Sequence, residues 1–538
     1  MQYRAECDVL VLGTGAAALV AAIRAHDGGA QVLVLERSDK IGGTTSVSGG
    51  VVWVPNNHHM AEVGILDSEE EAWTYLRRLH GGSSNEELLA AFIEWGPKMV
   101  RYLEERTPVR FAAMEKYPDY HPDWEGGKPG GRSLDNEPFD SKRLPPEVAK
   151  RIRKGPLLGP FTHREASTWG PVRNFDFVLM ANRVRDKILT LGTALIAALT
   201  LGCVERSIPI ELGVRARRLL VEDGRVVGVE AEENGQTVRF RARKAVVIAT
   251  GGFEWNEDMK KQFLRGPELA PTSPPFNEGD GILMGMAVGA RLGRMNDAWW
   301  MPSIQLPGEE YEGRQLNRLL INERAYPGSI IVNRAGRRFV NETCNYADLG
   351  KAFHVFDPST YDYPNIPAYL IFDERYHSRY HLATVMPGDE MPGWVAQGNT
   401  PQELAEKIGV DPAGLAATIE RFNRFAGEGV DHDFGRGGTI CERHYGDPDV
   451  GPNPTMAPLD TPPFYAVEVR PGSLGTKGGL EVNGKAQVLN VWGEVIPGLY
   501  ACGNAAAAVT GAGYGGAGGT LGPGMTFGFL AGMHAAAE

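Results

Sequence analysis

The segments Asp8-Val-Leu-Val-Leu-Gly-Thr-Gly-Ala-Ala-Ala18 and Gln31-Val-Leu-Val-Leu-Glu36 decide the fold of this chain. The first begins with an apolar run that predicts a buried strand, and a glycine turn and a helix over 17–26 follow it. The second predicts another strand, which ends in an acid. A strand, a glycine turn, a helix and a strand with a terminal acid form the pattern that binds a dinucleotide.

The residues of this first unit have distinct expected roles. Gly13 makes the tight turn, Gly15 lets the backbone approach a pyrophosphate, and Ala18 keeps helix and strand close. The N-terminus of the helix faces the phosphates, because its free amide groups attract an anion. Glu36 lies about 20 residues after the turn, where a carboxylate can bind the ribose hydroxyls of an adenosine.

The residues after the acid distinguish NAD from FAD. The run Lys40-Ile-Gly-Gly-Thr-Thr-Ser-Val-Ser-Gly-Gly50 is a second segment of glycines and hydroxyls. A nicotinamide dinucleotide has no need of such a loop. An extended FAD passes it with its pyrophosphate, ribityl chain and ring edge, so backbone amides and the hydroxyls of Thr44, Thr45 and Ser48 can bind the cofactor. We therefore predict FAD.

Composition restricts the possible functions. The 538 residues are 42% hydrophobic and 23% charged, which is typical of a globular protein with one large or two moderate cores. A net charge of -12 without a basic run argues against nucleic acid as a partner. The cysteines are scattered without a CxxC pair. The histidines His58, His59, His354 and His381 are not spaced as ligands, so no metal site is expected.

The sequence predicts a cytoplasmic protein. No signal peptide fits before the first strand, because cleavage there would destroy the nucleotide site. The apolar stretch 188–204 is slightly shorter than the roughly 20 residues that span a bilayer, so we predict a buried helix and no integral membrane segment. Peripheral membrane contact stays open, although no amphipathic cationic helix supports it.

The middle of the chain combines short strands with turns. The dipeptides Asp223-Gly224 and Asn234-Gly235 separate β-rich runs and predict a β-meander. It leads into Lys244-Ala-Val-Val-Ile-Ala-Thr-Gly-Gly252, an apolar strand that returns the chain to the parallel sheet. Gly279-Asp-Gly281 is expected to open a helix over 282–292.

The composition changes after about residue 294. Aromatic residues interleaved with Pro and Gly indicate a second domain that caps an apolar pocket, with 401–427 as its clearest helical part. The strand 498–504 and a helix with Pro523 in its first turn then return to the nucleotide domain. The N-terminus of that helix can stabilise negative charge on a reduced flavin ring.

We predict an α/β fold with an α+β cap. A Rossmann-like FAD-binding domain, with a parallel sheet and a β-meander, comprises residues 1–294 and 466–538. A smaller catalytic cap domain comprises residues 295–465.

Three separated motifs resemble those of a known family. They are Tyr117-Pro-Asp-Tyr120, Phe339-Val-Asn-Glu-Thr-Cys-Asn-Tyr346 and Tyr514-Gly-Gly-Ala-Gly-Gly-Thr-Leu-Gly-Pro523, and Leu474-Gly-Thr-Lys-Gly-Gly479 is a fourth. Over nearly its whole length the chain resembles the flavoprotein family that includes fumarate reductases and 3-ketosteroid dehydrogenases, and within it the 3-ketosteroid Δ1-dehydrogenases. Asn345-Tyr346 occupies the position where soluble fumarate reductases have an arginine-centred acid, which counts against a dicarboxylate substrate.

The glycine-rich segments and the resemblance together imply a set of cofactor contacts. The residues predicted to contact FAD are Gly13, Gly15, Ala16, Ala17, Glu36, Arg37, Gly43, Thr44, Thr45, Ser48, Gly49, Gly50, Val214, Ala249, Thr250, Gly251, Asp280, Gly503, Asn504 and Leu521.

The resemblance also implies catalytic roles. Tyr514 and the amide of Gly518 would bind the C3 carbonyl oxygen of a 3-ketosteroid, Tyr346 would take a proton from C2, and Tyr120 would assist. A hydride from C1 would pass to flavin N5. This chemistry needs donors at the developing enolate, and a tyrosinate is a strong base if neighbours lower its pKa from about 10. Gly515 stands where the family usually has proline, so we expect it to loosen Tyr514.

The resulting hypothesis is an FAD-dependent oxidoreductase that acts on CH–CH donors and desaturates 3-ketosteroids between C1 and C2 in lipid degradation. Its electrons would leave for a quinone or a similar acceptor. The alternatives are a Δ4-(5α)-dehydrogenase or another cyclic-ketone desaturase, a fumarate-type enoate reductase, and a flavin-dependent sensor or carrier without turnover.

Overall fold

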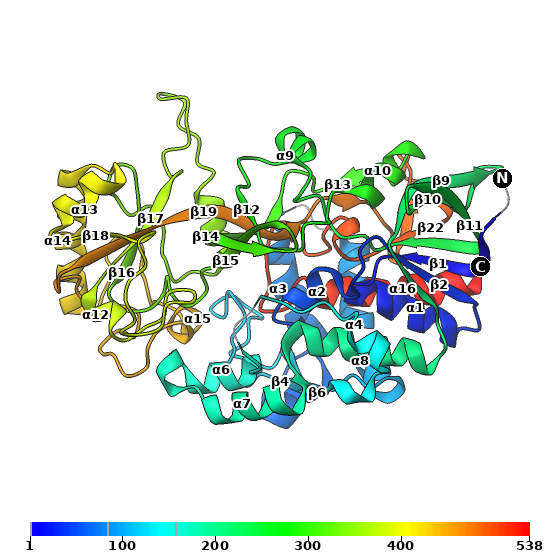
Figure 1. Cartoon of the computed structure of the whole chain (residues 1–538), viewed down its shortest axis with the longest axis horizontal. Helices are drawn as coiled ribbons and strands as arrows, with labels where there is room; N and C mark the ends of the chain where they lie inside the picture. Colours follow the sequence, from blue (N-terminus) through cyan, green and yellow to red (C-terminus); the bar gives the residue numbers. More distant parts are fainter. Residues whose placement is uncertain (1–2, 83–84, 157–158) are drawn as a thin grey trace.

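A computed structural model describes residues 3–82, 85–156 and 159–538 of the chain. Two large β-sheets follow one another along the longest axis (Figure 1). One end of the molecule holds the predicted nucleotide sheet together with both chain termini, and the other end holds a second sheet with helices α13 (Pro401–Ile408) and α14 (Pro412–Glu428). The α/β fold with a cap is therefore confirmed.

The first sheet is largely parallel. Its strands run in the order β21 (Gln487–Leu489), β22 (Val495–Ala501), β11 (Gln236–Ile248), β1 (Ala5–Leu12), β2 (Val32–Glu36) and β8 (Ile210–Leu212). Strand β1 lies parallel to both β2 and β11. Residues 9–12 are completely buried or nearly so, as expected for a parallel strand covered on both faces. The carboxyl ends of these strands form one edge, where such sheets bind ligands.

The helices α1 (Ala16–Asp27) and α16 (Leu521–Ala537) pack closely at this sheet (Figure 1). A Cβ atom at Gly528 would lie 2.3 Å from the carbonyl oxygen of Ala17. A Cβ atom at Gly532 would lie 2.3 Å from the carbonyl oxygen of Ala21. Glycine in α16 therefore sets the short distance between the two helices.

The meander differs from the prediction in one respect. Strands β9 (Val214–Glu222) and β10 (Arg225–Glu233) are antiparallel as expected, but the third run and the apolar strand after it form the single strand β11. Polar and partly buried residues occupy the first part of β11, and only its last four residues are continuously buried. The strand thus extends from the meander into the parallel sheet.

The helix expected over 282–292 is shorter. Helix α10 spans Asp280–Ala287, and Leu292 belongs to β13 (Leu292–Gly293). Gly289 has a φ of +83°, and the amide of Ala290 donates to the carbonyl of Gly285. This left-handed glycine ends the helix.

The second sheet is mainly antiparallel. Its strands run in the order β15 (Arg314–Leu319), β14 (Ala298–Tyr311), β19 (Phe464–Thr476), β17 (Ala368–Asp373) and β16 (Ser329–Asn333), and β12 (Ala270–Pro271) and β18 (Ala396–Gly398) also pair with β19. The segment 401–427 forms two helices, α13 (Pro401–Ile408) and α14 (Pro412–Glu428), because Gly409 ends the first in a left-handed conformation.

Side chains alternate between the two faces of this sheet. Ile330 and Val332 of β16 face α13 and α14, whereas Ile331 packs into a second apolar cluster on the other face.

The predicted domain boundaries at 294/295 and 465/466 stay a prediction. Strand β19 crosses the second of them.

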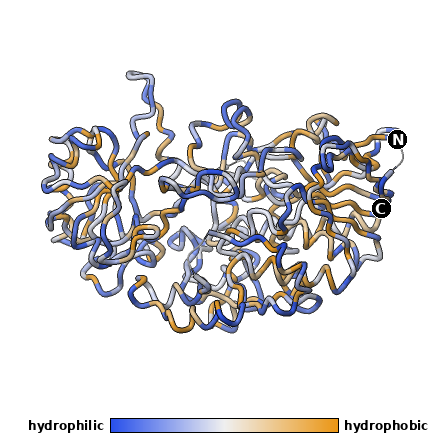
Figure 2. The backbone as a smooth tube through the Cα atoms, in the orientation of Figure 1, coloured by the Kyte–Doolittle hydropathy of each residue, from blue (hydrophilic) through white to orange (hydrophobic). Residues whose placement is uncertain are grey.

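Figure 2 shows the apolar backbone segments concentrated in the interior strands, with hydrophilic segments outside. Helix α8 (Leu191–Glu205) is apolar and buried, as predicted for 188–204. Within the described ranges, no helix has the length and hydropathy needed to cross a membrane. The remaining elements are α2 (Gly43–Val47), α3 (Glu69–His80), α4 (Glu86–Arg106), α5 (Pro146–Ala149), α6 (His163–Trp169), α7 (Phe177–Asp186), α9 (Glu257–Phe263), α11 (Tyr346–Ala352), α12 (Glu374–His377), α15 (Ile440–His444), β3 (Val52–Trp53), β4 (Phe111–Ala113), β5 (Ser133–Asn136), β6 (Phe139–Asp140), β7 (Ile188–Leu189), β20 (Gly479–Leu480) and the 3-10 helices η1 (His58–Val63), η2 (Ser141–Arg143), η3 (Val172–Asn174) and η4 (Gly503–Ala505).

The close packing of α1 and α16 is testable with Gly528→Ala. The added methyl group would overlap the Ala17 carbonyl, so the free energy of unfolding should fall by about 1–3 kcal/mol, measured by denaturant unfolding. Gly427→Ala in α14 is the matched control, because a Cβ atom at Gly427 would meet no other described atom within 4 Å. This control should leave stability unchanged or raise it by up to about 1 kcal/mol. Equal stability of the two variants would contradict the packing argument.

Candidate active site

A cavity of about 730 Å³ lies at the carboxyl edge of the parallel sheet and reaches the second sheet. Every residue predicted to contact FAD lines it. Tyr120, Tyr346, Tyr514 and Gly518 line the same cavity. The fold thus gathers segments from the whole length of the chain around one site.

The first glycine turn has the geometry that a pyrophosphate requires. Gly13 has a φ of +110°, and a Cβ atom there would lie 2.4 Å from the carbonyl oxygen of Ala249. Helix α1 begins after Gly15 without a side-chain cap. The amide of Ala16 donates to Thr45 Oγ1 at 3.1 Å, and the helix N-terminus opens on the cavity. Uncapped amide groups at this position favour a bound anion.

The second glycine run forms the short helix α2 where a loop was expected. Its hydroxyls hold the segment together. Ser48 Oγ donates to the carbonyl of Thr45 at 2.7 Å and accepts from the amide of Gly50 at 3.0 Å. Asn277 Nδ2 donates to Thr44 Oγ1 at 2.8 Å. These hydroxyls organise the backbone of the segment and also line the cavity.

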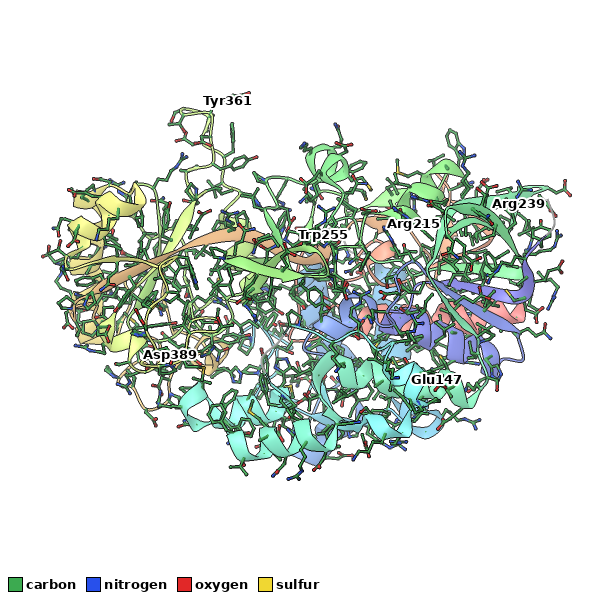
Figure 3. All side chains as sticks on the ribbon, viewed as in Figure 1. Glu147, Arg215, Arg239, Trp255, Tyr361 and Asp389 are labelled. Carbon is green, nitrogen blue, oxygen red and sulfur yellow. The ribbon has the colours of Figure 1, made fainter. Side chains whose placement is uncertain are left out.

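The adenosine end of the site is formed by ordered charges. Glu36 is buried and accepts from Thr14 Oγ1 at 2.7 Å and from the amide of Ser38 at 2.9 Å. Asp280 forms ion pairs with Arg215 at 2.6 Å and with Arg37 at 3.2 Å. Arg215, labelled in Figure 3, comes from β9 and was not predicted, although it directly follows the predicted Val214.

These features fit a bound FAD. Helix α16 begins at Leu521 without a side-chain cap and opens on the same cavity as α1. Thr250 Oγ1 is buried without a hydrogen-bond partner among the described residues, and Gly503 keeps a φ of +62° beside the helix end. Two uncapped helix N-termini and an unpaired buried hydroxyl are suited to a large anionic ligand that hydrogen-bonds along its length.

Three tyrosines meet at the other end of the cavity. The rings of Tyr120 and Tyr346 have centroids 5.3 Å apart, those of Tyr120 and Tyr514 5.3 Å, and those of Tyr346 and Tyr514 5.5 Å, with each pair edge to face. Tyr120 donates a hydrogen bond of 2.7 Å to the hydroxyl of Tyr346. All three are buried. The sequence motifs that carry them are therefore one structural unit.

The expected lowering of the Tyr346 pKa is not the net result in this structure. Burial raises the pKa of Tyr346 well above its usual value, and the nearby Tyr514 and Tyr117 raise it further, whereas the hydrogen bond from Tyr120 lowers it. Desolvation of the charged form is the largest effect. Tyr346 is a neutral phenol at neutral pH, with one neighbour that favours its ionised form.

Sequence reasoning missed two further tyrosines. The hydroxyls of Tyr117 and Tyr445 lie 3.1 Å apart, and both residues belong to the same buried cluster as Tyr120, Tyr346 and Tyr514. Both Tyr117 and Tyr445 line the cavity. Tyr117 belongs to the Tyr117-Pro-Asp-Tyr120 motif and could have been found there, but nothing in the local sequence marks Tyr445.

Gly518 has the conformation expected of a backbone donor. Its φ is +91°, and a Cβ atom would lie 2.5 Å from the carbonyl oxygen of Val51. The amide of Trp53 donates to the carbonyl of Gly518 at 3.1 Å, which fixes the peptide against β3. Within the described part of the chain, the Gly518 amide donates to no protein acceptor.

Comparison with known proteins agrees with this geometry. A family model described as "FAD binding domain" matches residues 8–521. The chain belongs to this FAD-binding family. It is 41% identical to the 4-oxocyclohexanecarboxylate 2-dehydrogenase of Sinomonas cyclohexanicum, over 99% of this chain and 94% of the relative. It is 37% identical to the 3-oxosteroid 1-dehydrogenase of Mycobacterium tuberculosis, over 99% of this chain and 98% of the relative.

A solved structure is similar over the whole chain. The 3-ketosteroid delta1-dehydrogenase of Sterolibacterium denitrificans, in complex with 1,4-androstadiene-3,17-dione, superposes with a TM-score of 0.94 at 39% identity, covering 99% of each chain. The predicted resemblance to 3-ketosteroid Δ1-dehydrogenases, the FAD cofactor and the oxidoreductase class are confirmed.

Gly515 was expected to loosen Tyr514, but the segment around Gly515 is held by several contacts. The carbonyl of Gly515 accepts from the Tyr75 hydroxyl at 2.7 Å and from the amide of Tyr120 at 3.0 Å. A Cβ atom at Gly515 would lie 2.8 Å from the ring of Trp53. In this flavoprotein a tryptophan ring therefore fills the space beside Gly515, and contacts from three segments replace the stiffness of a proline.

Lys477 of the predicted Leu474–Gly479 motif supports the same loop. Its Nζ donates to the carbonyls of Gly511, Ala512 and Gly513 at 2.8–3.2 Å, directly before Tyr514. Lys351 of α11 also donates to Ala512, at 2.8 Å. The helix that begins with Tyr346 and the loop that carries Tyr514 are thus fixed through a shared carbonyl. Burial lowers the pKa of Lys477 to about 7.

The complementarity of Gly515 and Trp53 is testable with a double-mutant cycle. Gly515→Pro should lower the free energy of unfolding by about 1–3 kcal/mol, because its Cβ overlaps the indole ring. In a Trp53→Leu background the same change should cost much less, and the difference between the two costs measures the coupling. Denaturant unfolding monitored by flavin absorbance provides the measurement. Identical costs in both backgrounds would show that Trp53 does not determine the choice of glycine.

Proposed function

We propose that this flavoprotein introduces the C1–C2 double bond of 3-ketosteroids. The observation that carries the proposal is the contact between Tyr120, Tyr346 and Tyr514 in one buried cluster, at the end of the cavity opposite the charged adenosine end. When bound, FAD supplies the acceptor for the hydride that leaves C1. The protein must supply the groups that polarise the ketone and accept the proton.

The donors for the carbonyl oxygen are Tyr514 and the amide of Gly518. Thr520 Oγ1 donates to the Tyr514 hydroxyl at 3.2 Å, which leaves the phenolic hydrogen free to point at a ligand. Donors held in place before the reaction stabilise a developing enolate without reorganisation, and this makes the C2 proton more acidic.

Tyr346 is the proposed base at C2. Its hydroxyl oxygen accepts from Tyr120, which stabilises the phenolate form that the reaction needs. The pKa of Tyr120 is also raised by burial, so both phenols keep their protons, and Tyr346 must lose its proton before it can accept the one from C2. Tyr120, hydrogen-bonded to Tyr346, and the hydroxyl pair of Tyr117 and Tyr445 belong to the same buried cluster, and we assign to them the relay of the proton that leaves Tyr346.

The charges at the cavity favour an uncharged substrate. Each arginine that lines it within the described residues already has a carboxylate partner: Arg37 with Glu278, Arg153 with Glu312, Arg215 with Asp280, and Arg318 with Glu309. Burial lowers the pKa of His444 to about 4, so its ring is neutral. A carboxylate on the substrate would meet no unpaired arginine among the described lining residues, whereas Val51, Met301 and Leu474 offer an apolar surface to a steroid.

A second candidate is the desaturation of a smaller cyclic ketone. The relative from Sinomonas cyclohexanicum favours it, since its name specifies 4-oxocyclohexanecarboxylate and it is 41% identical to this chain. The same tyrosines would serve that reaction, because it also removes a proton beside a ring ketone. The two candidates differ in whether the substrate carries a carboxylate. In either case we propose a quinone or a similar acceptor for the electrons, and a cytoplasmic location.

A substrate comparison tests the proposal. Anaerobic mixing of the FAD-loaded enzyme with 4-androstene-3,17-dione should bleach the flavin, and mass spectrometry and NMR should place the new double bond between C1 and C2. 4-Oxocyclohexanecarboxylate should react with a kcat/KM at least about tenfold lower, because the desolvation of its carboxylate is not offset by an ion pair. Bleaching by the carboxylate alone would establish the second candidate. A double bond at C4–C5 would indicate a Δ4-(5α)-dehydrogenase.

Tyr346→Phe tests the base. Removing the hydroxyl should lower kcat by about 100-fold or more, the usual contribution of a positioned base, while the flavin spectrum stays unchanged. Tyr361→Phe is the matched control, because Tyr361 is 83% exposed and lies at the tip of a protruding segment (Figure 3). Full turnover of Tyr346→Phe would contradict the assignment of Tyr346 as the base. A carrier without turnover would show no turnover itself, and Tyr346→Phe would leave all its measured properties unchanged.

A further inference from the structure

A group of metal-ligating side chains lies outside the cavity, where 3-10 helix η1 meets the end of α4. His58 and His59 are the first residues of η1, and Glu104 lies in the last turn of α4. One potential ligand atom from each of the three lies within 4.8 Å of the others. Their spacing in sequence did not predict a metal site, because Glu104 is 45 residues away from His59.

The three side chains converge on one carboxylate oxygen. His58 Nε2 lies 3.0 Å from Glu104 Oε2, and His59 Nε2 also lies 3.0 Å from Glu104 Oε2. Ligands of a tetrahedral zinc ion lie about 3.3 Å apart, given bonds of about 2.0–2.2 Å. Small movements of these side chains would therefore admit an ion. The side chains are 20%, 11% and 14% exposed, so a fourth position can be taken by water.

Neighbouring groups orient two of the three ligands. His59 Nδ1 lies 2.9 Å from Glu62 Oε2 and His59 Nε2 lies 3.0 Å from Glu104 Oε2, so both ring nitrogens face carboxylates. An ion that replaced the hydrogen on Nε2 would leave the Nδ1 donor to Glu62 in place. The amide of Phe111 donates to Glu104 Oε1 at 3.0 Å, which leaves Oε2 for a metal. A carboxylate behind a ligating histidine is a common feature of zinc sites, since it fixes the tautomer and makes the ring a better ligand.

We propose that His58, His59 and Glu104 bind a divalent transition metal ion, Zn²⁺, with water as the fourth ligand. Two imidazoles and one carboxylate suit Zn²⁺, whereas Ca²⁺ and Mg²⁺ need more oxygen ligands. The ion would connect η1 to the end of α4, beside Phe111 at the start of β4. The site is separate from the residues that line the cavity, so its role is structural or regulatory.

The test uses the FAD-loaded enzyme after treatment with a chelator and gel filtration. Titration with Zn²⁺ against a chromophoric chelator should give one high-affinity site per chain, and Zn²⁺ should raise the unfolding temperature. His59→Ala and Glu104→Gln should each weaken binding by about tenfold or more, and Glu62→Gln should weaken it by about tenfold through the orientation of His59. Co²⁺ should give d–d absorption bands that His59→Ala lacks.

His432→Ala is the matched control. His432 Nε2 lies 2.8 Å from Glu428 Oε2 on the exposed surface, so this pair offers one imidazole and one carboxylate but lacks the second histidine of the proposed site. It should leave zinc binding unchanged. Flavin absorbance and the metal-free unfolding temperature show whether each variant is folded. The exposed Glu62→Gln keeps the test decisive if the buried variants do not fold. Absence of a one-to-one site, or undiminished binding by a His58→Ala/His59→Ala variant, would overturn the proposal.

Discussion

The parallel pairing of β1 with β2 on one side and with β11 on the other is the constraint on which the site depends. It brings the turn after β1, the acid at the end of β2 and the segment after β11 to one edge of the sheet. The close approach of Gly13 to Ala249 shows how tightly the first and third of these are held. Because backbone pairing fixes these positions, the glycine turn and the helix N-terminus offer main-chain groups to the cofactor, and side chains such as Glu36 complete this end of the cavity.

The tyrosine end of the cavity depends on a different constraint, a buried charge network behind the tyrosines. Arg132 is fully buried between Asp119 and Asp67, with distances of 2.9 and 2.7 Å. Asp119 also accepts from the indole nitrogen of Trp53 at 2.8 Å. Burial raises the pKa of Asp119 to about 6, against the opposing effect of Arg132. Removing one partner would leave an uncompensated buried charge. The network therefore holds Asp119, the residue directly before Tyr120, in a fixed position.

The sequence predicted the cofactor half well because its signals are local. Strand β1, the glycine turn, α1 and Glu36 lie within forty residues, and each has a backbone requirement that the residue types reveal.

The prediction failed where one element crosses two environments. Strand β11 begins with alternating burial in the meander and ends fully buried in the sheet, so its two parts had different patterns. The range predicted for helix α10 was too long at its end, because the small residues continue past Gly289. The proposed catalytic groups show the limit of local patterns. Tyr120, Tyr346 and Tyr514 could be named only through motifs of a family, since the contact between Tyr120 and Tyr346 spans 226 residues. Tyr445 lies 328 residues from its partner Tyr117, and no motif marked it. The sequence could not predict that the pKa of Tyr346 is raised, because this shift depends on how much water the folded chain excludes from the phenol.

The division of charge within the cavity follows from these two constraints together. The ion pairs of Arg37 and Arg215 with Asp280 join the end of β2, β9 and α10, which all belong to the cofactor side. The tyrosine end is lined by apolar side chains, including Val51 directly before β3, Met301 of β14 and Leu474 of β19. Paired charges at one end can bind the polar cofactor without attracting a second anion to the other. The hydroxyls of Tyr120, Tyr346 and Tyr514 are therefore buried among apolar side chains, and the low local dielectric strengthens each hydrogen bond that they donate.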